Sequence, residues 1–200
     1  MKNLQTNSQM ITKTDFKPGT MIYPLPAVLV GCGDTPENYN LITIAWTGTL
    51  CTDPPVCYIS VRPERHSYAL IRKSGDFTIN LTTSVMAKAV DWCGVRSGRD
   101  HDKWKECGLT PGPAHQISSP VVMESPVNIE CRVKEILELG CHHAFVSEVV
   151  NIQVSSHLID PATGKFNLVD ANLLAYVHGT YRFIGKKAGS FGFSVKKARS

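Results

Sequence analysis

The chain has 200 residues, of which 42% are hydrophobic and 19% charged, a composition that suits one globular domain and excludes a disordered protein. Its 21 basic and 17 acidic side chains leave a formal charge of +4, too small an excess to indicate nucleic acid as the main ligand. The N-terminus lacks the apolar core of a secretory signal, and no apolar run approaches the roughly 20 residues that cross a bilayer, so we expect a cytoplasmic protein without membrane contact.

Strand patterns dominate the chain after a polar beginning. Residues 1–20 lead to the turn signal Pro18-Gly19 and are predicted to form an N-terminal arm. Apolar, β-branched or alternating segments then predict strands over 27–32, 40–51, 56–62, 77–81, 121–139, 142–159 and 173–184, with a break in the fifth at Ser125-Pro126. We therefore expect a domain over residues 21–185, followed by a basic, Gly/Lys-rich tail at 186–200.

The segment Asp53-Pro54-Pro55 separates two of these strands. Proline fixes φ and removes a backbone donor, so this segment predicts a turn. The strands on either side of it are expected to pair as a hairpin.

Two short helices interrupt the strands. Ser67 is predicted to cap a helix that Ser74-Gly75 ends, and Thr83 or Ser84 is predicted to cap a second helix that Gly94 ends. Helices this brief cannot cross over a parallel sheet, so the sequence predicts a mainly β, antiparallel barrel. The segments 94–104 and 111–120 have no apolar periodicity and are expected to be surface connections.

A candidate anion site lies in the segment 60–68, where a strand runs into the first helix. Arg62 and Arg65 stand just before the helix, whose first N–H groups have no intrahelical partner, and Ser67 adds a hydroxyl. A phosphate would suit these groups. The alternative is that Ser67 only caps the helix and that the arginines are solvated.

A candidate ring-binding strand carries Asn40, Thr43, Trp46, Thr47 and Thr49. Its amide and hydroxyl groups could bond the heteroatoms of a flat heterocycle while the indole packs on the ring. The alternative is an ordinary strand with threonines on its wet face. Further along, Lys103 is either a second phosphate partner or a solvated loop charge.

The cysteines and histidines give no metal or thiol site. The seven cysteines include no CxxC pair, which argues against a disulfide framework or a zinc ribbon and favours a reducing compartment. Cys141 precedes His142 and His143, but neighbouring residues of a strand point to opposite faces, so no metal is predicted here. No base can be assigned to any cysteine, and buried inert thiols are the commoner case.

Several short motifs follow one another along the chain. The first half contains Pro26-x-Val28-Leu29-Val30, Asn40-x-x-Thr43-x-Ala45-Trp46, Asp53-Pro54-Pro55, Ser60-Val61-Arg62-Pro63-x-Arg65-x-Ser67 and Phe77-x-x-Asn80. The second half contains Asp91-Trp92-Cys93-Gly94-Val95-x-Ser97-Gly98-Arg99-Asp100-x-Asp102-Lys103-Trp104, Glu130-Cys131, and Gly140-x-His142 followed by Ser147-Glu148-Val149. In this order the motifs resemble the flavin reductase-like, FMN-binding split-barrel family, and those of the second half resemble its flavoredoxin branch.

The resemblance implies a six-stranded Greek-key split barrel and a homodimer that holds FMN non-covalently near the subunit interface. It assigns FMN contacts to Asn40, Trp46, Thr47, Val61, Arg62, Arg65, Ser67, Asn80, Lys103 and His142. Ser67 and Lys103 would hold the phosphate, and His142 would lie beside the isoalloxazine as the catalytic residue. Tyr176 and Tyr181 are further candidates for contact with the cofactor.

Three functions are compatible with these observations. The leading hypothesis is an NAD(P)H-dependent flavin oxidoreductase, with NADH or NADPH as electron donor. The second is an FMN-containing carrier that exchanges electrons with a redox-protein partner. The third is a flavin-binding dimer without turnover, because a shared fold does not by itself carry an activity.

Overall fold

The computed structural model describes residues 12–195 of the chain. Its strands are β1 (Leu25–Pro26), β2 (Val28–Cys32), β3 (Asn40–Ile44), β4 (Thr47–Cys51), β5 (Val56–Val61), β6 (Asp76–Leu81), β7 (Pro111–Gly112), β8 (Val121–Val122), β9 (Val127–Glu138), β10 (His143–Val154), β11 (Leu174–Val177) and β12 (Thr180–Phe183). Its α-helices are α1 (His66–Ser74), α2 (Ala87–Val95) and α3 (Lys103–Cys107). Short 3₁₀ helices cover Pro36–Asn38, Ser84–Met86, Ser156–Leu158, Leu168–Ala171 and Phe193–Val195.

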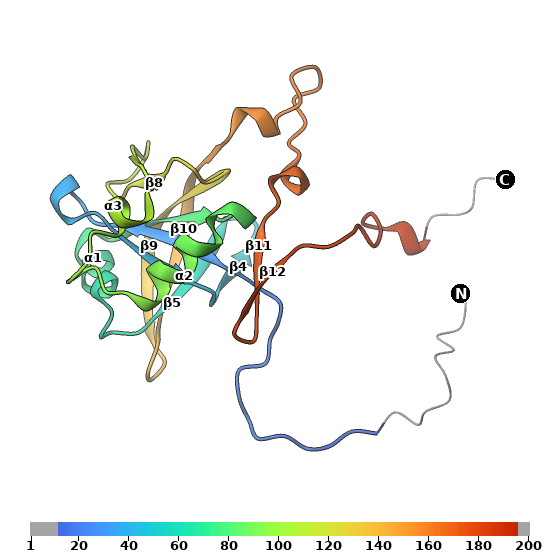
Figure 1. Cartoon of the computed structure of the whole chain (residues 1–200), viewed down its shortest axis with the longest axis horizontal. Helices are drawn as coiled ribbons and strands as arrows, with labels where there is room; N and C mark the ends of the chain where they lie inside the picture. The colour runs from blue at the N-terminus through green and yellow to red at the C-terminus, as the bar shows by residue number, and fades with distance from the viewer. Residues whose placement is uncertain (1–11, 196–200) are drawn as a thin grey trace.

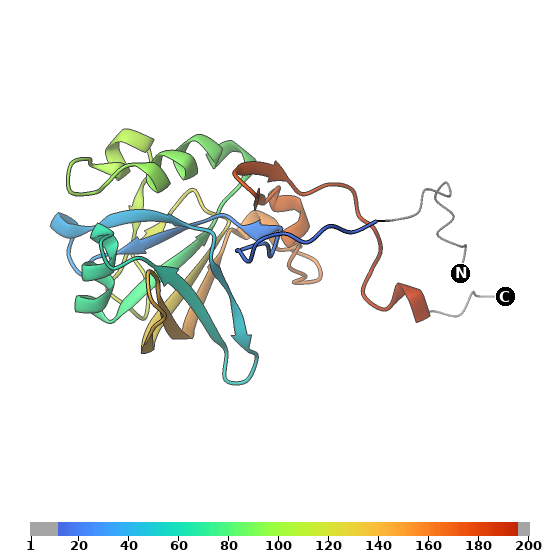
Figure 2. The same cartoon turned by 90° about the horizontal axis from the view of Figure 1, so that it is seen from below.

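The largest sheet curls into an incomplete barrel. Within residues 12–195 it has seven antiparallel strands in the order β3-β2-β6-β9-β10-β5-β4. Strands β3 and β4 are thus at opposite edges, although only Ala45 and Trp46 separate them along the chain. The sheet must curl until its two edges meet at this corner, as Figures 1 and 2 show.

This architecture confirms the mainly β split-barrel fold. The sheet has seven strands, one more than the six that the family resemblance implied. The segment 40–51, expected as one strand, forms both β3 and β4. The break lies at the corner, where Thr47 N–H donates to the Ala45 carbonyl at 3.1 Å. The expected hairpin across Asp53-Pro54-Pro55 is present as the pair β4 and β5.

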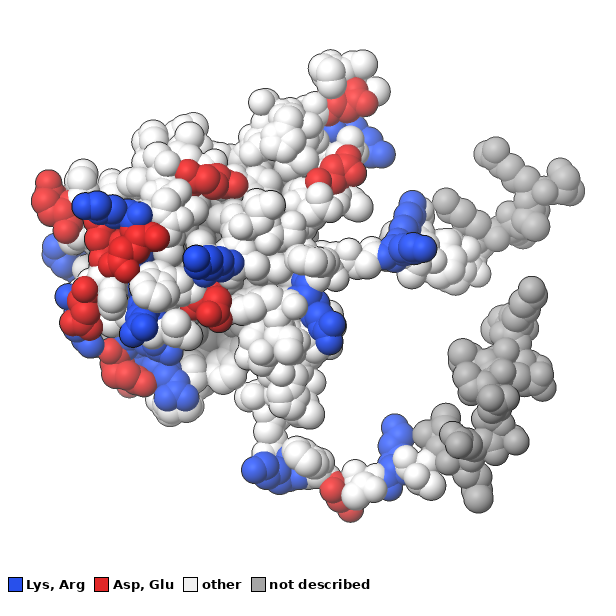
Figure 3. All heavy atoms as spheres, viewed as in Figure 1, with Lys and Arg blue, Asp and Glu red and all other residues white. Residues whose placement is uncertain are grey.

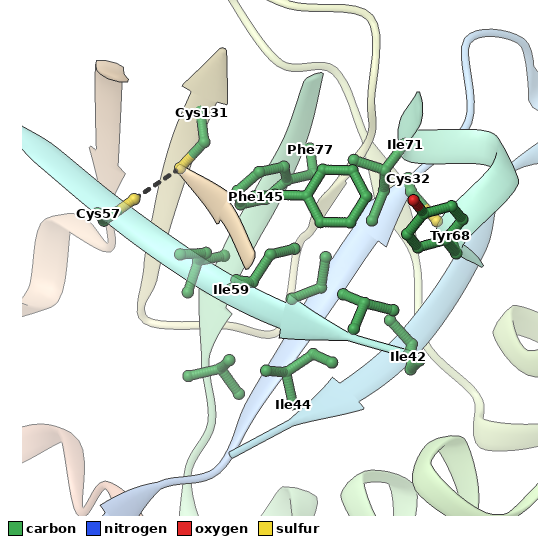
Figure 4. Packing of buried hydrophobic residues seen from close by; sticks show 14 residues of the cluster. Cys32, Ile42, Ile44, Cys57, Ile59, Tyr68, Ile71, Phe77, Cys131 and Phe145 are labelled. Carbon is green, nitrogen blue, oxygen red and sulfur yellow. Dashed lines mark hydrogen bonds between the residues drawn. The ribbon is translucent and has the colours of Figure 1, made fainter. Parts of the chain in front are cut away.

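Strand β2 explains why the molecule has two apolar cores. Alternate residues of a strand point to opposite faces, and all five residues of β2 are buried. Val28 and Val30 face the barrel interior, where Phe77 and Phe145 lie (Figure 4). Leu29 faces the other way, into a second core under α2 and α3. Each such side chain contributes about 1.5–3 kcal/mol by leaving water.

The helices differ from the sequence predictions in two details. Helix α1 begins two residues early, so Arg65 instead of Ser67 occupies the capping position and Ser67 lies inside the first turn; Gly75 ends this helix as expected, with φ at +73°. Helix α2 continues through Gly94 instead of ending there. A Cβ at Gly94 would lie 3.4 Å from Thr43 Cβ of β3, which is van der Waals contact, so the helix packs closely on the sheet here.

Helix α3 is the main correction to the expected surface connections. Asp102 caps it by accepting the Lys105 N–H at 3.1 Å. Lys103 and Trp104 are then buried, at 3% and 7% exposure. The segment 94–104 therefore carries part of the second core, although its sequence has no apolar period.

The expected long strand over 173–184 folds back on itself. His178 and Gly179 both have positive φ and reverse the chain, so β11 and β12 form a hairpin that joins β1 in a second, three-stranded sheet. The expected break at Ser125-Pro126 is confirmed, since the segment 121–139 forms β8 and β9 on either side of it. The segment 142–159 is a shorter strand than expected, because it forms β10 and then a short helix.

The segments near both chain ends leave the body on the same side (Figure 2). The expected arm and tail are described only from residue 12 and up to residue 195; the rest of each lies outside the described residues. Charged side chains of both signs gather at the end of the body where α1 and α3 lie (Figure 3). Among the described residues, no helix combines the length and apolar character that a membrane-spanning segment needs.

Candidate functional site

Two adjoining cavities lie at the barrel corner, between β3, β5 and the helices α1 and α2. The first has a volume of about 400 Å³ and the second about 270 Å³. Ile42, Arg62 and Arg65 line both, so the cavities are two parts of one groove. Their sizes are in the range of sites that bind small organic ligands.

The first cavity has aromatic walls. Trp46, at the corner, packs on His142, with ring centroids 4.4 Å apart and planes inclined by 47°. Tyr176 and Tyr181 of the β11–β12 hairpin also line it, and the Tyr181 hydroxyl donates to Asp91 Oδ1 at 3.3 Å. Burial and the nearby Asp91 carboxylate raise the pKa of Tyr181 to about 12. A flat ring would find aromatic surface and a few fixed polar groups here.

The second cavity lies at the start of α1. No side chain caps this end of the helix among residues 12–195. The Tyr68 N–H bonds the Arg65 carbonyl at 3.0 Å, so the N–H groups of His66 and Ser67 are the ones available, at the positive end of the helix dipole. His66, Ser67 and Arg65 line the cavity, and Arg99 faces it from the segment after α2. The combination is typical of an anion site.

Asn40 and Gly98 shape the wall of the second cavity. Asn40 is buried and its Nδ2 donates to Ser67 Oγ at 2.8 Å, which links β3 to α1. A Cβ on Gly98 would lie 2.1 Å from Asn40 Oδ1, so only glycine permits this close approach. Sequence reasoning missed Gly98 as a site residue, although its place in the Ser97-Gly98-Arg99 motif was a usable signal.

Lys103 is a buried cation without a counter-ion among residues 12–195. Its Nζ donates to the carbonyls of Leu41 and Cys93, each at 2.8 Å, and it lines the second cavity. The ion pairs formed by the described residues do not include it. Burial lowers the pKa of Lys103. An ammonium has three N–H groups, so a third donor is available to an anion in the cavity.

The histidines at the groove favour their neutral forms. Burial and the Arg62 charge lower the pKa of His142, and burial and the Arg99 charge lower the pKa of His66. His142 Nδ1 lies 3.3 Å from Cys141 Sγ. The next residue, His143, points away and bonds the Tyr68 hydroxyl at 2.8 Å, as expected for neighbours on a strand.

The structure brings together most of the residues that the sequence singled out. Trp46, Val61 and His142 line the first cavity, Asn40, Ser67 and Lys103 line the second, and Arg62 and Arg65 line both.

Thr47 and Asn80 lie outside the two cavities. Thr47 Oγ1 donates to the Tyr58 carbonyl at 2.6 Å. Asn80 is fully buried, and its amide bonds Leu29 O, Thr78 Oγ1, Val122 N–H and Asn128 Nδ2. Both residues therefore hold the barrel together in this structure and do not face the groove.

The comparisons with known proteins agree with this geometry. The family model described as "Flavin reductase like domain" matches residues 20–185. The chain is similar to the flavoredoxin of Desulfovibrio vulgaris (Miyazaki F), with 27% identity, a TM-score of 0.84, and 92% of this chain and 100% of that chain covered. The flavoredoxin from Methanosarcina acetivorans gives 26% identity, a TM-score of 0.83, and coverage of 93% and 100%.

A reductase is also similar in sequence. The reductase component of 4-nitrophenol 4-monooxygenase/4-nitrocatechol 2-monooxygenase of Rhodococcus opacus is 29% identical over 114 residues, which cover 57% of this chain and 58% of that protein.

Proposed function

Because the chain belongs to the flavin reductase-like family, we propose that it is an oxidoreductase that binds FMN non-covalently and takes electrons from NADH or NADPH. The observation that carries the proposal is Lys103, a buried ammonium that lines an uncapped helix start and lacks a counter-ion in the described chain. A cofactor with an anionic tail and a flat ring matches the two parts of the groove.

The groups in the second cavity would hold the phosphate. Lys103 and Arg65 supply positive charge, Ser67 supplies a hydroxyl, and the first N–H groups of α1 supply further donors. Thr47 and Asn80 are not part of this assignment, since their polar groups are already bonded within the barrel.

The groups in the first cavity would receive the ring. When bound, FMN supplies hydride acceptance and electron transfer, so the protein needs no nucleophile of its own. Trp46 and His142 offer an aromatic wall, and the Arg62 guanidinium offers positive charge at the cavity edge. Positive charge or an N–H donor near a ring that gains electrons favours its reduced form.

Reconstitution tests this proposal. The visible spectrum of the purified full-length protein, followed by titration with FMN, is expected to show a bound flavin. Stopped-flow mixing with NADH and with NADPH separately is then expected to bleach the flavin absorbance with at least one of them. Failure to bind FMN would remove the cofactor assignment; binding without reduction by either donor would remove only the NAD(P)H activity.

An electron carrier is the second candidate, and the similarity to two flavoredoxins supports it. It predicts that FMN stays bound through gel filtration and that a redox protein, instead of free nicotinamide, reduces it. Binding with no reduction by either route would favour the third function, a flavin-binding protein without turnover.

His142 is proposed as the catalytic residue, and its replacement separates a chemical role from a packing role. We expect His142→Phe to keep the aromatic contact with Trp46 and to bind FMN within about threefold of the wild type, while flavin reduction slows by about tenfold or more. Stopped-flow rates and FMN titrations measure the two effects. His143→Ala is the matched control, because that ring bonds Tyr68 and faces away from the cavity. It should lower stability and leave the reduction rate unchanged; equal losses of rate in both variants would contradict the assignment.

A homodimer and a cytoplasmic location complete the proposal. Apolar side chains such as Ile22, at 85% exposure, and Phe191, at 106%, stand free on the segments that leave the body, and a second subunit would cover them. The seven cysteines are free, which supports a reducing compartment.

A further inference from the structure

Two thiols face each other beside the second cavity. Cys93 lies in α2 and Cys107 at the end of α3, and their sulfur atoms are 3.8 Å apart. Both are free. Since a disulfide bond is about 2.05 Å long, each sulfur would have to move by less than about 1 Å to form one.

The two thiols differ in access to solvent. Cys93 is fully buried, whereas Cys107 is half-buried and lines a surface hollow of about 720 Å³ together with Lys88, Trp92 and Glu106. A small oxidant can therefore reach Cys107 first. Burial raises the pKa of both thiols, that of Cys93 to about 12, so only a small fraction of each is thiolate at neutral pH. Because the thiolate is the form that reacts with peroxides, we expect oxidation to be slow and to need a high concentration of oxidant.

A second close pair in the molecule shows that short sulfur distances alone do not suffice. Cys57 and Cys131 have sulfur atoms 3.5 Å apart inside the barrel (Figure 4). Their strands, β5 and β9, are the two neighbours of β10, so their backbones are two interstrand spacings apart, about 9–10 Å. This exceeds the roughly 7 Å between Cα atoms that a disulfide spans. No strand lies between α2 and α3, which pack directly on each other.

We propose that Cys93 and Cys107 form an oxidative modification site that a hydroperoxide converts into a disulfide. Cys107 attacks hydrogen peroxide, becomes a sulfenic acid and releases one water. The Cys93 thiol then attacks that sulfur, the S–S bond forms, and a second water leaves. Two thiols and one peroxide thus give one disulfide and two waters, and a dithiol reductant reverses the change.

The disulfide would fix one wall of the groove. It closes residues 93–107 into a ring that contains Gly98 and Arg99 and that also carries Lys103, whose Nζ already bonds the Cys93 carbonyl. A cross-link of this size restricts the unfolded chain and the loop between the helices. We therefore expect oxidation to raise Tm by roughly 5–10 °C and to slow hydrogen exchange in the segment 94–102.

Oxidation of the full-length protein tests the site. The reduced protein is treated with millimolar hydrogen peroxide, remaining thiols are alkylated under denaturing conditions, and peptides are mapped by mass spectrometry. We expect a Cys93–Cys107 cross-linked peptide, the rise in Tm, and the loss of both on treatment with dithiothreitol. Cys107→Ser is expected to show neither, and Cys107→Ala serves if the serine variant fails to fold.

Cys131→Ala is the matched control, since it removes the other close pair without burying a hydroxyl. Its cross-linked peptide and its rise in Tm on oxidation should match those of the wild type. The proposal is overturned if Cys93 and Cys107 are recovered as free thiols under conditions that oxidise the exposed Cys51 and Cys141. Recovery of Cys107 as a sulfinic acid beside an alkylated Cys93 would overturn it as well. None of these readouts needs a flavin, so failure of FMN binding would leave the test valid.

Discussion

Replacing Lys103 with methionine is expected to weaken FMN binding by about 10–100-fold and to leave the binding of riboflavin, which has no phosphate, nearly unchanged. A charge-assisted hydrogen bond contributes about 1.5–3 kcal/mol, and each 1.4 kcal/mol is a factor of ten in Kd. Methionine has nearly the length of the lysine stem, so the variant removes the charge and keeps most of the volume. Fluorescence titration of the two flavins measures the difference directly.

The matched control for this prediction is Lys105→Met on the same helix. Lys105 is exposed, and within residues 12–195 its side chain forms none of the hydrogen bonds or ion pairs of the second cavity. It should bind both flavins as the wild type does. Equal loss of FMN and riboflavin binding in Lys103→Met would mean that the buried ammonium supports the fold of the cavity and not the phosphate. Circular dichroism and thermal unfolding of the variant separate that outcome from simple misfolding.

The second large effect is expected at Glu130 of β9. This carboxylate is fully buried and accepts hydrogen bonds from the backbone N–H groups of His115 and Gln116 and from the side-chain amides of Asn151 and Gln153, at 2.7–3.0 Å. It ties the segment 111–120 to the long β9–β10 ribbon. We expect Glu130→Gln to lower the free energy of unfolding by about 3–5 kcal/mol, because an amide would turn an N–H group toward donors that lose their acceptor.

Denaturant unfolding measures this loss, and Glu135→Gln is the control. Glu135 lies on the same strand but is exposed, so its replacement should change stability by less than about 0.5 kcal/mol. A similarly small change in Glu130→Gln would contradict the proposed role of the carboxylate.

The same carboxylate should make stability depend on acid pH. Burial alone would raise the pKa of Glu130, but the bound N–H donors hold it below its usual value. The ionised form is therefore favoured by the folded state, so its contribution is complete above the pKa of the unfolded chain and is lost as pH falls through the lower, folded value. Between pH 6 and pH 3 the wild type should lose more stability than Glu130→Gln does.

Local sequence patterns predicted most strands, because the features that specify them involve residues only a few positions apart. The alternation over 56–62, the prolines at 53–55 and the glycine at 75 fix backbone geometry or one buried face directly. These predictions agree with β5, the β4–β5 hairpin and the end of α1. The candidate anion site around Ser67 was found for the same reason, since a turn into a helix exposes its N–H groups wherever it occurs. The candidate ring-binding strand around Trp46 was likewise found from residues that are close together in the sequence.

Helix α3 shows where local reasoning ended. Its five residues are too few to show an apolar period. A single lysine in such a polar segment is normally interpreted as a solvated loop charge. Only the packing of α3 under α2 buries that ammonium against two carbonyls of distant segments. Asn80 shows the reverse case: the family resemblance placed it at the cofactor, whereas four hydrogen bonds hold it inside the barrel, three to residues of β2, β8 and β9 and one to Thr78 of its own strand.

The sequence by itself determined the fold class and the chemical character of the groove, because periodicity, turn residues and the motif order depend on neighbours along the chain. The tertiary structure decided which polar groups are already bonded and which remain available. Hydrogen-bond partners such as Leu41 for Lys103 or Val122 for Asn80 lie tens of residues away, and no local pattern specifies them. The same holds for Cys93 and Cys107, which are adjacent only because α2 and α3 fold onto one face of the barrel.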